Sequence, residues 1–63
     1  MNPFISQREA GIARQRGIIA AAEKEMKSIK DDVAKATTSD TIRRAGIRIS
    51  ELETQIKELS KPH

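Results

Sequence analysis

The sequence predicts an all-α fold: an antiparallel, coiled-coil-like two-helix hairpin that forms a single domain over residues 1–63. Three observations support this prediction. Apolar residues recur every seventh position in the first half of the chain and alternate at spacings of three and four in the second half. A short run of hydroxyl and carboxylate residues separates the two patterns. The chain is also too short for more than one domain.

The first helix is predicted over about residues 6–36. Its apolar stripe consists of Ile5, Ile12, Ile19, Met26 and Val33. Two starting points are open. Ser6 and Glu9 fit a capping box, in which each side chain accepts a backbone N–H of the first turn. Asn2 and Pro3 would instead begin the helix earlier, with proline in the first turn, where its missing N–H is not needed.

The turn is predicted at residues 37–39. Short polar side chains compete with helical hydrogen bonds and favour caps, so Thr38 or Ser39 would cap the second helix and Asp40 would lie in its first turn. The first stripe, continued by seven from residue 33, falls on residue 40, whereas the second stripe begins at residue 42. This change of phase favours a bent chain over one continuous helix.

The second helix is predicted over about residues 40–60, and Pro62 and His63 follow its end. A connection of only a few residues makes consecutive helices antiparallel neighbours. The stripe of the second helix consists of Ile42, Ala45, Ile49, Leu52, Ile56 and Leu59.

Folding about this turn would pair the second helix with roughly residues 18–36 of the first, at about 1.5 Å per residue. Residues 2–17 would then project beyond the second helix. Ile5 and Ile12 lie in that projecting part, and we expect them to be bare. Exposed apolar stripes of this kind mark contact surfaces.

A chain of this size without cysteine needs another source of stability, and a second copy would provide it. Small residues of the first helix lie on the side away from its stripe, although helix propensity alone also explains exposed alanines. A dimer forming a four-helix bundle is the simplest closed assembly. The predicted protein interface consists of Ile5, Ile12, Gly17, Ile19, Ala20 and Ile47.

The composition argues against catalysis, a metal site, a cofactor or a small-molecule ligand. Phe4 is the only aromatic residue, cysteine is absent, and the one histidine is His63 at the chain end. The only adjacent carboxylates are Asp31 and Asp32, and neighbouring helical residues point about 100° apart. We therefore expect this protein to have neither enzymatic activity nor a catalytic residue.

The net charge is +3, from 12 basic and 9 acidic residues. On a helical wheel Arg14 lies far from Arg8 and Arg16, and acidic residues are interspersed, so a solvated surface is the favoured interpretation. Six arginines remain candidate contacts for a polyanion or an acidic partner: Arg8, Arg14, Arg16, Arg43, Arg44 and Arg48.

These observations predict a non-enzymatic protein–protein interaction module, such as an adaptor, an assembly component or a small inhibitor. It would self-associate through the first helix and present a helix face to a partner protein. The alternative is a nucleic-acid-binding regulator that uses the arginine clusters on a helical dimer. The longest apolar run, residues 17–22, is far shorter than the roughly 20 residues that span a bilayer. We therefore expect no membrane contact and a cytoplasmic location.

Overall fold

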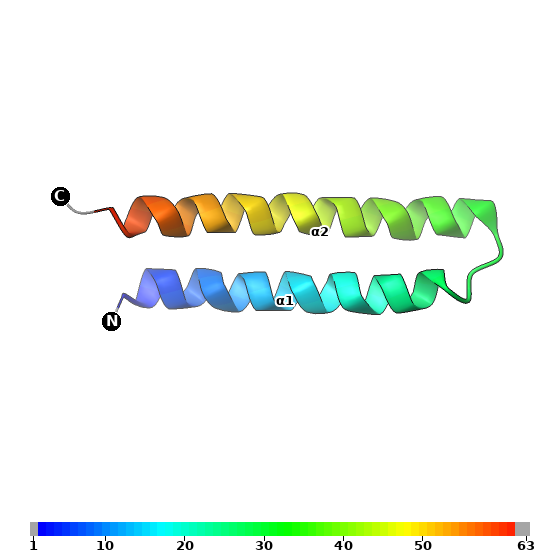
Figure 1. The fold of residues 1–63 in the computed structure, drawn as a ribbon, viewed down its shortest axis with the longest axis horizontal. Helices are drawn as coiled ribbons and strands as arrows, with labels where there is room; N and C mark the ends of the chain where they lie inside the picture. The colour runs from blue at the N-terminus through cyan, green and yellow to red at the C-terminus, as the bar shows by residue number, and fades with distance from the viewer. Residues whose placement is uncertain (1, 62–63) are drawn as a thin grey trace.

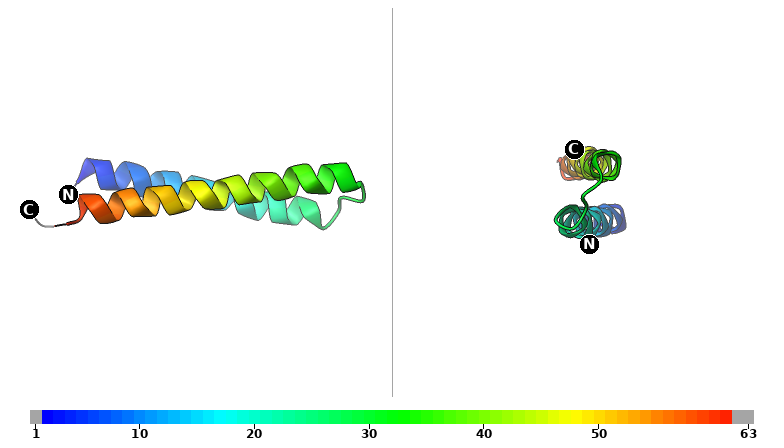
Figure 2. Two further views of the ribbon diagram at one scale, coloured as in Figure 1. Left: turned by 90° about the horizontal axis from the view of Figure 1, so that it is seen from above. Right: turned by 90° about the vertical axis from the view of Figure 1, so that its right-hand side faces the viewer.

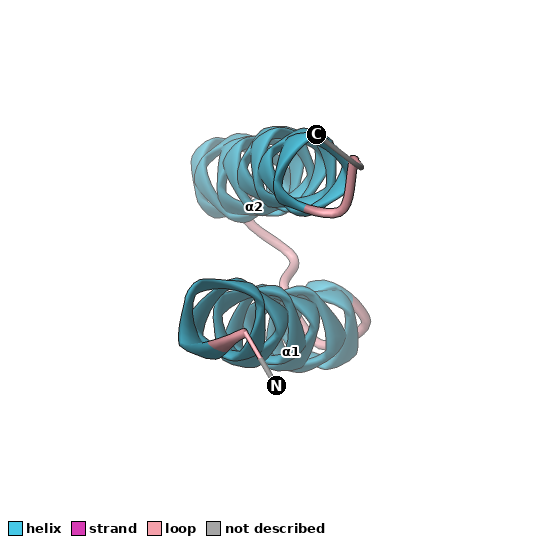
Figure 3. Ribbon diagram, turned by 90° about the vertical axis from the view of Figure 1, so that its left-hand side faces the viewer, coloured by secondary structure: helices cyan, strands magenta, loops and turns pink. Residues whose placement is uncertain are grey.

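The computed structural model describes residues 2–61, and these form two long antiparallel α-helices (Figure 1). Helix α1 spans Pro3–Met26 and helix α2 spans Asp32–Leu59, with a short loop over residues 27–31. The molecule is a rod with extents of 52 × 15 × 11 Å. The start of α1 and the end of α2 lie at the same end of this rod. An end-on view shows one helix stacked on the other in a single layer (Figure 3). The prediction of an all-α helical hairpin is confirmed.

Helix α1 begins at the earlier of the two predicted starts. The Asn2 side chain accepts a hydrogen bond from the Phe4 N–H, with an N–O distance of 2.9 Å, and Pro3 follows as the first helical residue. Ser6 is not the cap, because its N–H donates to the Asn2 carbonyl at 3.2 Å inside the helix. The proline fixes a helical φ from the first position onward.

The predicted turn at residues 37–39 is wrong, because the chain turns at residues 27–31. Helix α1 is therefore shorter than the predicted 6–36, and α2 begins well before residue 40. Asp31 caps α2: its side chain accepts from the Val33 N–H at 3.4 Å. Asp32 places a negative charge in the first turn, where it interacts favourably with the helix dipole.

The hydroxyl residues that were predicted to form the turn between the helices lie inside α2 instead. Thr37 donates its hydroxyl hydrogen to the Val33 carbonyl at 3.1 Å, and Thr41 donates to the Thr37 carbonyl at 3.2 Å. Each threonine thus bonds back by one turn, so neither competes for the N–H groups that hold the helix. Val33 is 73% exposed and does not continue the apolar stripe of α1. The change of phase between the stripes reflects the loop, which lies before Val33.

The two helices pair over their whole length, so the predicted projection of residues 2–17 is also wrong. Arg8 Nε donates to Gln55 Oε1 at 2.8 Å, which fixes the register near the open end of the hairpin. Because the chain turns earlier than predicted, α2 reaches back along the start of α1. Ile5 and Ile12 are consequently half-buried rather than bare. Seen from above, the helices cross at a shallow angle (Figure 2).

The core of the hairpin is thin. Among residues 2–61 only Ala22, Ala45 and Leu52 are buried, and two of these are small. The chain has an accessible surface of 5024 Å². A compact monomer of 7.0 kDa exposes about 4,000 Å². A single hairpin therefore leaves unusually much of its surface in contact with water.

Helix α2 ends at Leu59, and the Ser60 hydroxyl donates to the Ile56 carbonyl at 2.8 Å. Pro62 and His63, which the sequence places after the second helix, lie outside the described residues. Within residues 2–61, neither helix contains a stretch that is long and apolar enough to cross a membrane.

Candidate interaction surfaces

The line along which the helices touch divides the hairpin into two broad faces. Successive helical residues are turned by about 100°, so Gly11 and Ile12 lie on opposite sides of this line in α1. In α2, Leu52 and Ile49 are turned by about 60° from each other and also lie on either side of it. Gly11 and Leu52 meet on one face, since a Cβ added to Gly11 would lie 3.1 Å from Leu52 Cδ1. Ile12 and Ile49 therefore share the other face.

We call this second surface the isoleucine face. It carries six isoleucines, three from each helix, and each is half-buried. Moving seven residues forward along α1 corresponds to moving seven back along α2, because the helices are antiparallel. Extended from the contacts of Arg8 with Gln55 and of Gly11 with Leu52, this register places the isoleucines at similar heights in three layers: Ile5 near Ile56, Ile12 near Ile49, and Ile19 near Ile42. Two helices alone cannot cover these side chains completely.

A second row of α1 residues borders the isoleucine face and points into solvent. Small and charged side chains alternate along this row at spacings of four and three, and all are exposed. Its members are Glu9, Ala13, Arg16, Ala20 and Glu23. The alanines leave room for another helix to approach closely, whereas the charged residues restrict which helix can do so.

The six residues predicted as an interface do not all lie together. Ile5, Ile12, Ile19 and Ala20 belong to the isoleucine face or its border. Gly17 points away from α2, and a Cβ added to it would meet nothing within 4 Å. Ile47 is 49% exposed on the outer side of α2.

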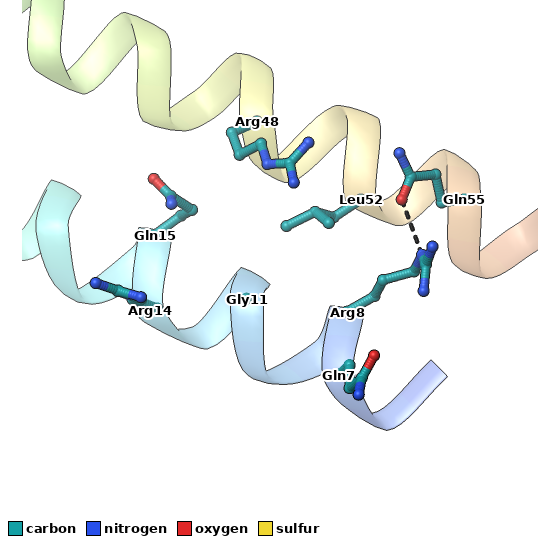
Figure 4. A pocket seen from close by; sticks show the side chains of 8 residues that line it. All are labelled: Gln7, Arg8, Gly11, Arg14, Gln15, Arg48, Leu52 and Gln55. Atoms are coloured by element: carbon teal, nitrogen blue, oxygen red, sulfur yellow. Dashed lines mark hydrogen bonds between the residues drawn. The ribbon is translucent and has the colours of Figure 1, made fainter. Parts of the chain in front are cut away.

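The opposite face contains a groove of about 350 Å³ between the helices, which we call the arginine groove (Figure 4). Three arginines and three glutamines surround an apolar floor. Among the described residues that line it, none is acidic. The lining consists of Gln7, Arg8, Gly11, Arg14, Gln15, Arg48, Leu52 and Gln55. Its positive charges favour a partner with carboxylate or phosphate groups.

Arg8 is held in place by both helices. Its Nε donates to Gln55 Oε1 of α2, and its Nη1 donates to the Phe4 carbonyl of α1 at 3.0 Å. Figure 4 shows Arg8 reaching across to Gln55, with Arg48 directed into the space between the helices. Arg48 also lies 3.9 Å from Glu51 on its own helix. The Arg8 guanidinium is therefore positioned before any ligand binds.

The remaining candidate arginines lie elsewhere. Asp40 pairs with Arg43 at 2.6 Å and with Arg44 at 2.8 Å. The hydrogen bond from Arg43 and the charges of both arginines lower the pKa of Asp40, although partial desolvation acts in the opposite direction. Arg16 lies at the border of the isoleucine face. The six arginines thus form no single basic surface.

The sequence did not predict the glutamines and Leu52 as part of a site. Arg8 and Gln15 stand three residues after Ile5 and Ile12, where a heptad pattern calls for apolar residues. This interruption of the pattern was the available signal. Which residues of α2 face them depends on the position of the turn.

The acidic residues form no further site. Asp31 serves as the cap of α2, and across residues 2–61 no three His, Cys, Asp or Glu side chains gather to hold a metal ion. No protein-family model, curated protein or solved structure matches the chain.

Proposed function

We propose that this chain is a non-enzymatic protein-interaction module that works as an adaptor, an assembly component or a small inhibitor. It self-associates through the isoleucine face and presents the arginine groove to a partner protein with acidic side chains. The observation that carries the proposal is the large accessible surface of a hairpin with only three buried residues in its described part. A second copy is the simplest way to cover that surface.

The areas support self-association. The accessible surface of 5024 Å² exceeds that of a compact monomer of this mass by about 1,000 Å². A standard protein–protein interface buries about 800 Å² on each partner. The chain has no cysteine for a disulfide, so a partner chain is the remaining source of additional stability.

The isoleucine face suits self-association better than the arginine groove does. Its side chains are apolar and half-buried, so a second copy would remove further apolar surface from water. Two copies packed groove to groove would bring Arg8, Arg14 and Arg48 close to the same residues of the other copy. Repulsion between these like charges disfavours that arrangement.

The groove suits an acidic protein better than a nucleic acid. Guanidinium groups bind carboxylates in a planar manner, and the hydrogen bonds from Nε and Nη1 fix the plane of the Arg8 guanidinium within the groove. Duplex binding requires many phosphate contacts along an extended basic surface. Arg43 and Arg44 are paired with Asp40 instead, and Arg16 lies outside the groove.

Two neighbouring alanines provide a matched test of self-association. Ala20 borders the isoleucine face, whereas Ala21 is turned about 100° further toward the other face, and both are exposed. Neither contributes to the buried core, so neither substitution removes a buried contact between the two helices of one hairpin. We expect Ala20→Glu to shift the protein toward monomer in sedimentation equilibrium at micromolar concentration, and Ala21→Glu to leave the wild-type mass unchanged. Equal masses for both variants would place the contact elsewhere.

A further inference from the structure

We infer that two copies of this chain pack their isoleucine faces together with the loops at opposite ends of the assembly. Helix α1 then lies antiparallel to α1 of the second copy, and α2 lies antiparallel to α2. The two-fold axis passes near Ile12 and Ala13 and is perpendicular to the rod. This inference rests on the self-association proposed above and specifies its geometry.

Two symmetric arrangements are available when flat faces meet. A two-fold axis perpendicular to the rod places α1 on α1, with the loops at opposite ends. A two-fold axis along the rod places α1 on α2 of the second copy, with both loops at the same end. Both bury the same isoleucines, so the charged residues that border the face distinguish them.

The first arrangement pairs opposite charges. With the axis near Ile12 and Ala13, residue 9 of α1 lies opposite residue 16 of the second copy. Glu9 therefore meets Arg16 of the second copy, and by symmetry Arg16 meets Glu9. Both side chains are exposed in the single hairpin and are free to form these pairs.

The second arrangement opposes like charges. By the register of Arg8 with Gln55 and of Gly11 with Leu52, Glu9 of α1 and Glu53 of α2 lie at nearly the same height in the hairpin. With the loops at one end, Glu9 would face Glu53 of the second copy, and this contact would occur twice. Arg16 would face the uncharged Gly46. The charge pattern therefore selects the arrangement with the loops apart.

The apolar residues and the small residues also fit this packing. Ile12 lies beside Ile12 of the second copy, and Ile5 lies beside Ile19. On α2, Gly46 faces the region of Glu53 of the second copy. A Cβ added to Gly46 would meet nothing within 4 Å in the single hairpin, so nothing within the hairpin accounts for this glycine. Close approach of a second helix does account for it.

Cross-linking tests the orientation directly, because the chain contains no cysteine. Two thiols form a disulfide only when their Cα atoms lie within about 7 Å. Ala13→Cys places a thiol beside the proposed axis, so mild oxidation should convert the dimer to a covalent dimer. Ala21→Cys on the other face is the matched control and should stay unlinked at the same concentration. In the arrangement with both loops at one end, the two copies of residue 13 lie on diagonal helices and cannot join.

A charge exchange provides the second measurement. Arg16→Glu should weaken dimerisation by about tenfold in sedimentation equilibrium, because two attractive pairs become repulsive. Glu9→Arg should have a similar effect, and the double variant should recover most of the wild-type affinity. A dimeric wild type without an Ala13→Cys cross-link, or without recovery in the double variant, would overturn this orientation and leave self-association standing. A monomeric wild type would overturn both.

Discussion

Gly11 of α1 lies directly against Leu52 of α2, so that a Cβ on Gly11 would stand 3.1 Å from Leu52 Cδ1. Leu52 is the only large side chain that is buried in the described part of the chain. The absence of a side chain at residue 11 thus lets the one sizeable core residue reach the backbone of the opposite helix. This contact also forms the floor of the arginine groove.

Gly11 and Gly17 consequently differ in how substitution by alanine should change the stability of the hairpin. Gly17 has open space around its Cβ position, so Gly17→Ala should raise the free energy of unfolding by about 1 kcal/mol through helix propensity. Gly11→Ala gains the same propensity but displaces Leu52, so we expect a clearly smaller gain or a loss. Urea unfolding at one protein concentration measures both. Equal stabilisation by the two substitutions would show that Leu52 does not depend on the space at Gly11.

The hydrogen bond between Arg8 and Gln55 provides a test of the register. Gln55→Glu replaces a neutral acceptor with a carboxylate 2.8 Å from the Arg8 Nε, in a part-buried position. We expect stabilisation by about 0.5–1 kcal/mol. In an Arg8→Met background the same substitution should give no gain. A gain of equal size in both backgrounds would mean that these two side chains do not meet in solution.

Asp40 makes the stability of α2 depend on pH. Its pKa is lower in the folded chain than in an unfolded one, mainly because of the hydrogen bond from Arg43. The ionised form therefore adds stability that is complete above about pH 4 and is lost as the pH falls below that value. Asp40→Asn should reduce the loss of stability between neutral and acidic pH, measured as the melting temperature across a pH series. An unchanged pH profile would contradict this role for Asp40.

Much of the fold could be predicted from the spacing of apolar residues alone. The repeats of isoleucine at seven-residue intervals indicate two helices and the side on which each contacts the other. The position of the turn could not be read from the same pattern, because a threonine can either cap a helix or bond back within one. Asp31, followed by Asp32, is also a typical N-cap. The hydroxyl residues at positions 37–39 are equally typical N-caps, so the sequence alone does not show which stretch begins the second helix.

The wrong position of the predicted turn also made the predicted exposure of surface residues wrong. A turn at residues 37–39 would leave Ile5 and Ile12 uncovered, whereas the observed loop at residues 27–31 brings α2 alongside them. The arginine groove depends on the same register, since Arg8 and Arg48 are distant in sequence and line one groove only when residues 27–31 form the loop. A helical wheel shows on which side of its own helix a residue lies. It does not show which residues of the other helix lie opposite.

Binding to duplex DNA or RNA is the principal alternative function. Among the described residues that line the groove only three are arginines, so we expect no retardation in a gel shift at about 0.15 M salt and at most weak retardation at low salt. Strong retardation with a steep salt dependence, reduced by Arg8→Gln or Arg48→Gln, would favour the nucleic-acid alternative.

One hairpin is expected to bury too little of its own surface to fold stably without a second copy. Thermal unfolding followed by circular dichroism over a hundredfold range of protein concentration tests this claim directly. If folding is coupled to dimerisation, the melting temperature rises with protein concentration by mass action. We expect this rise in melting temperature. A cooperative transition with the same melting temperature at every concentration, from a species of 7.0 kDa, would contradict it.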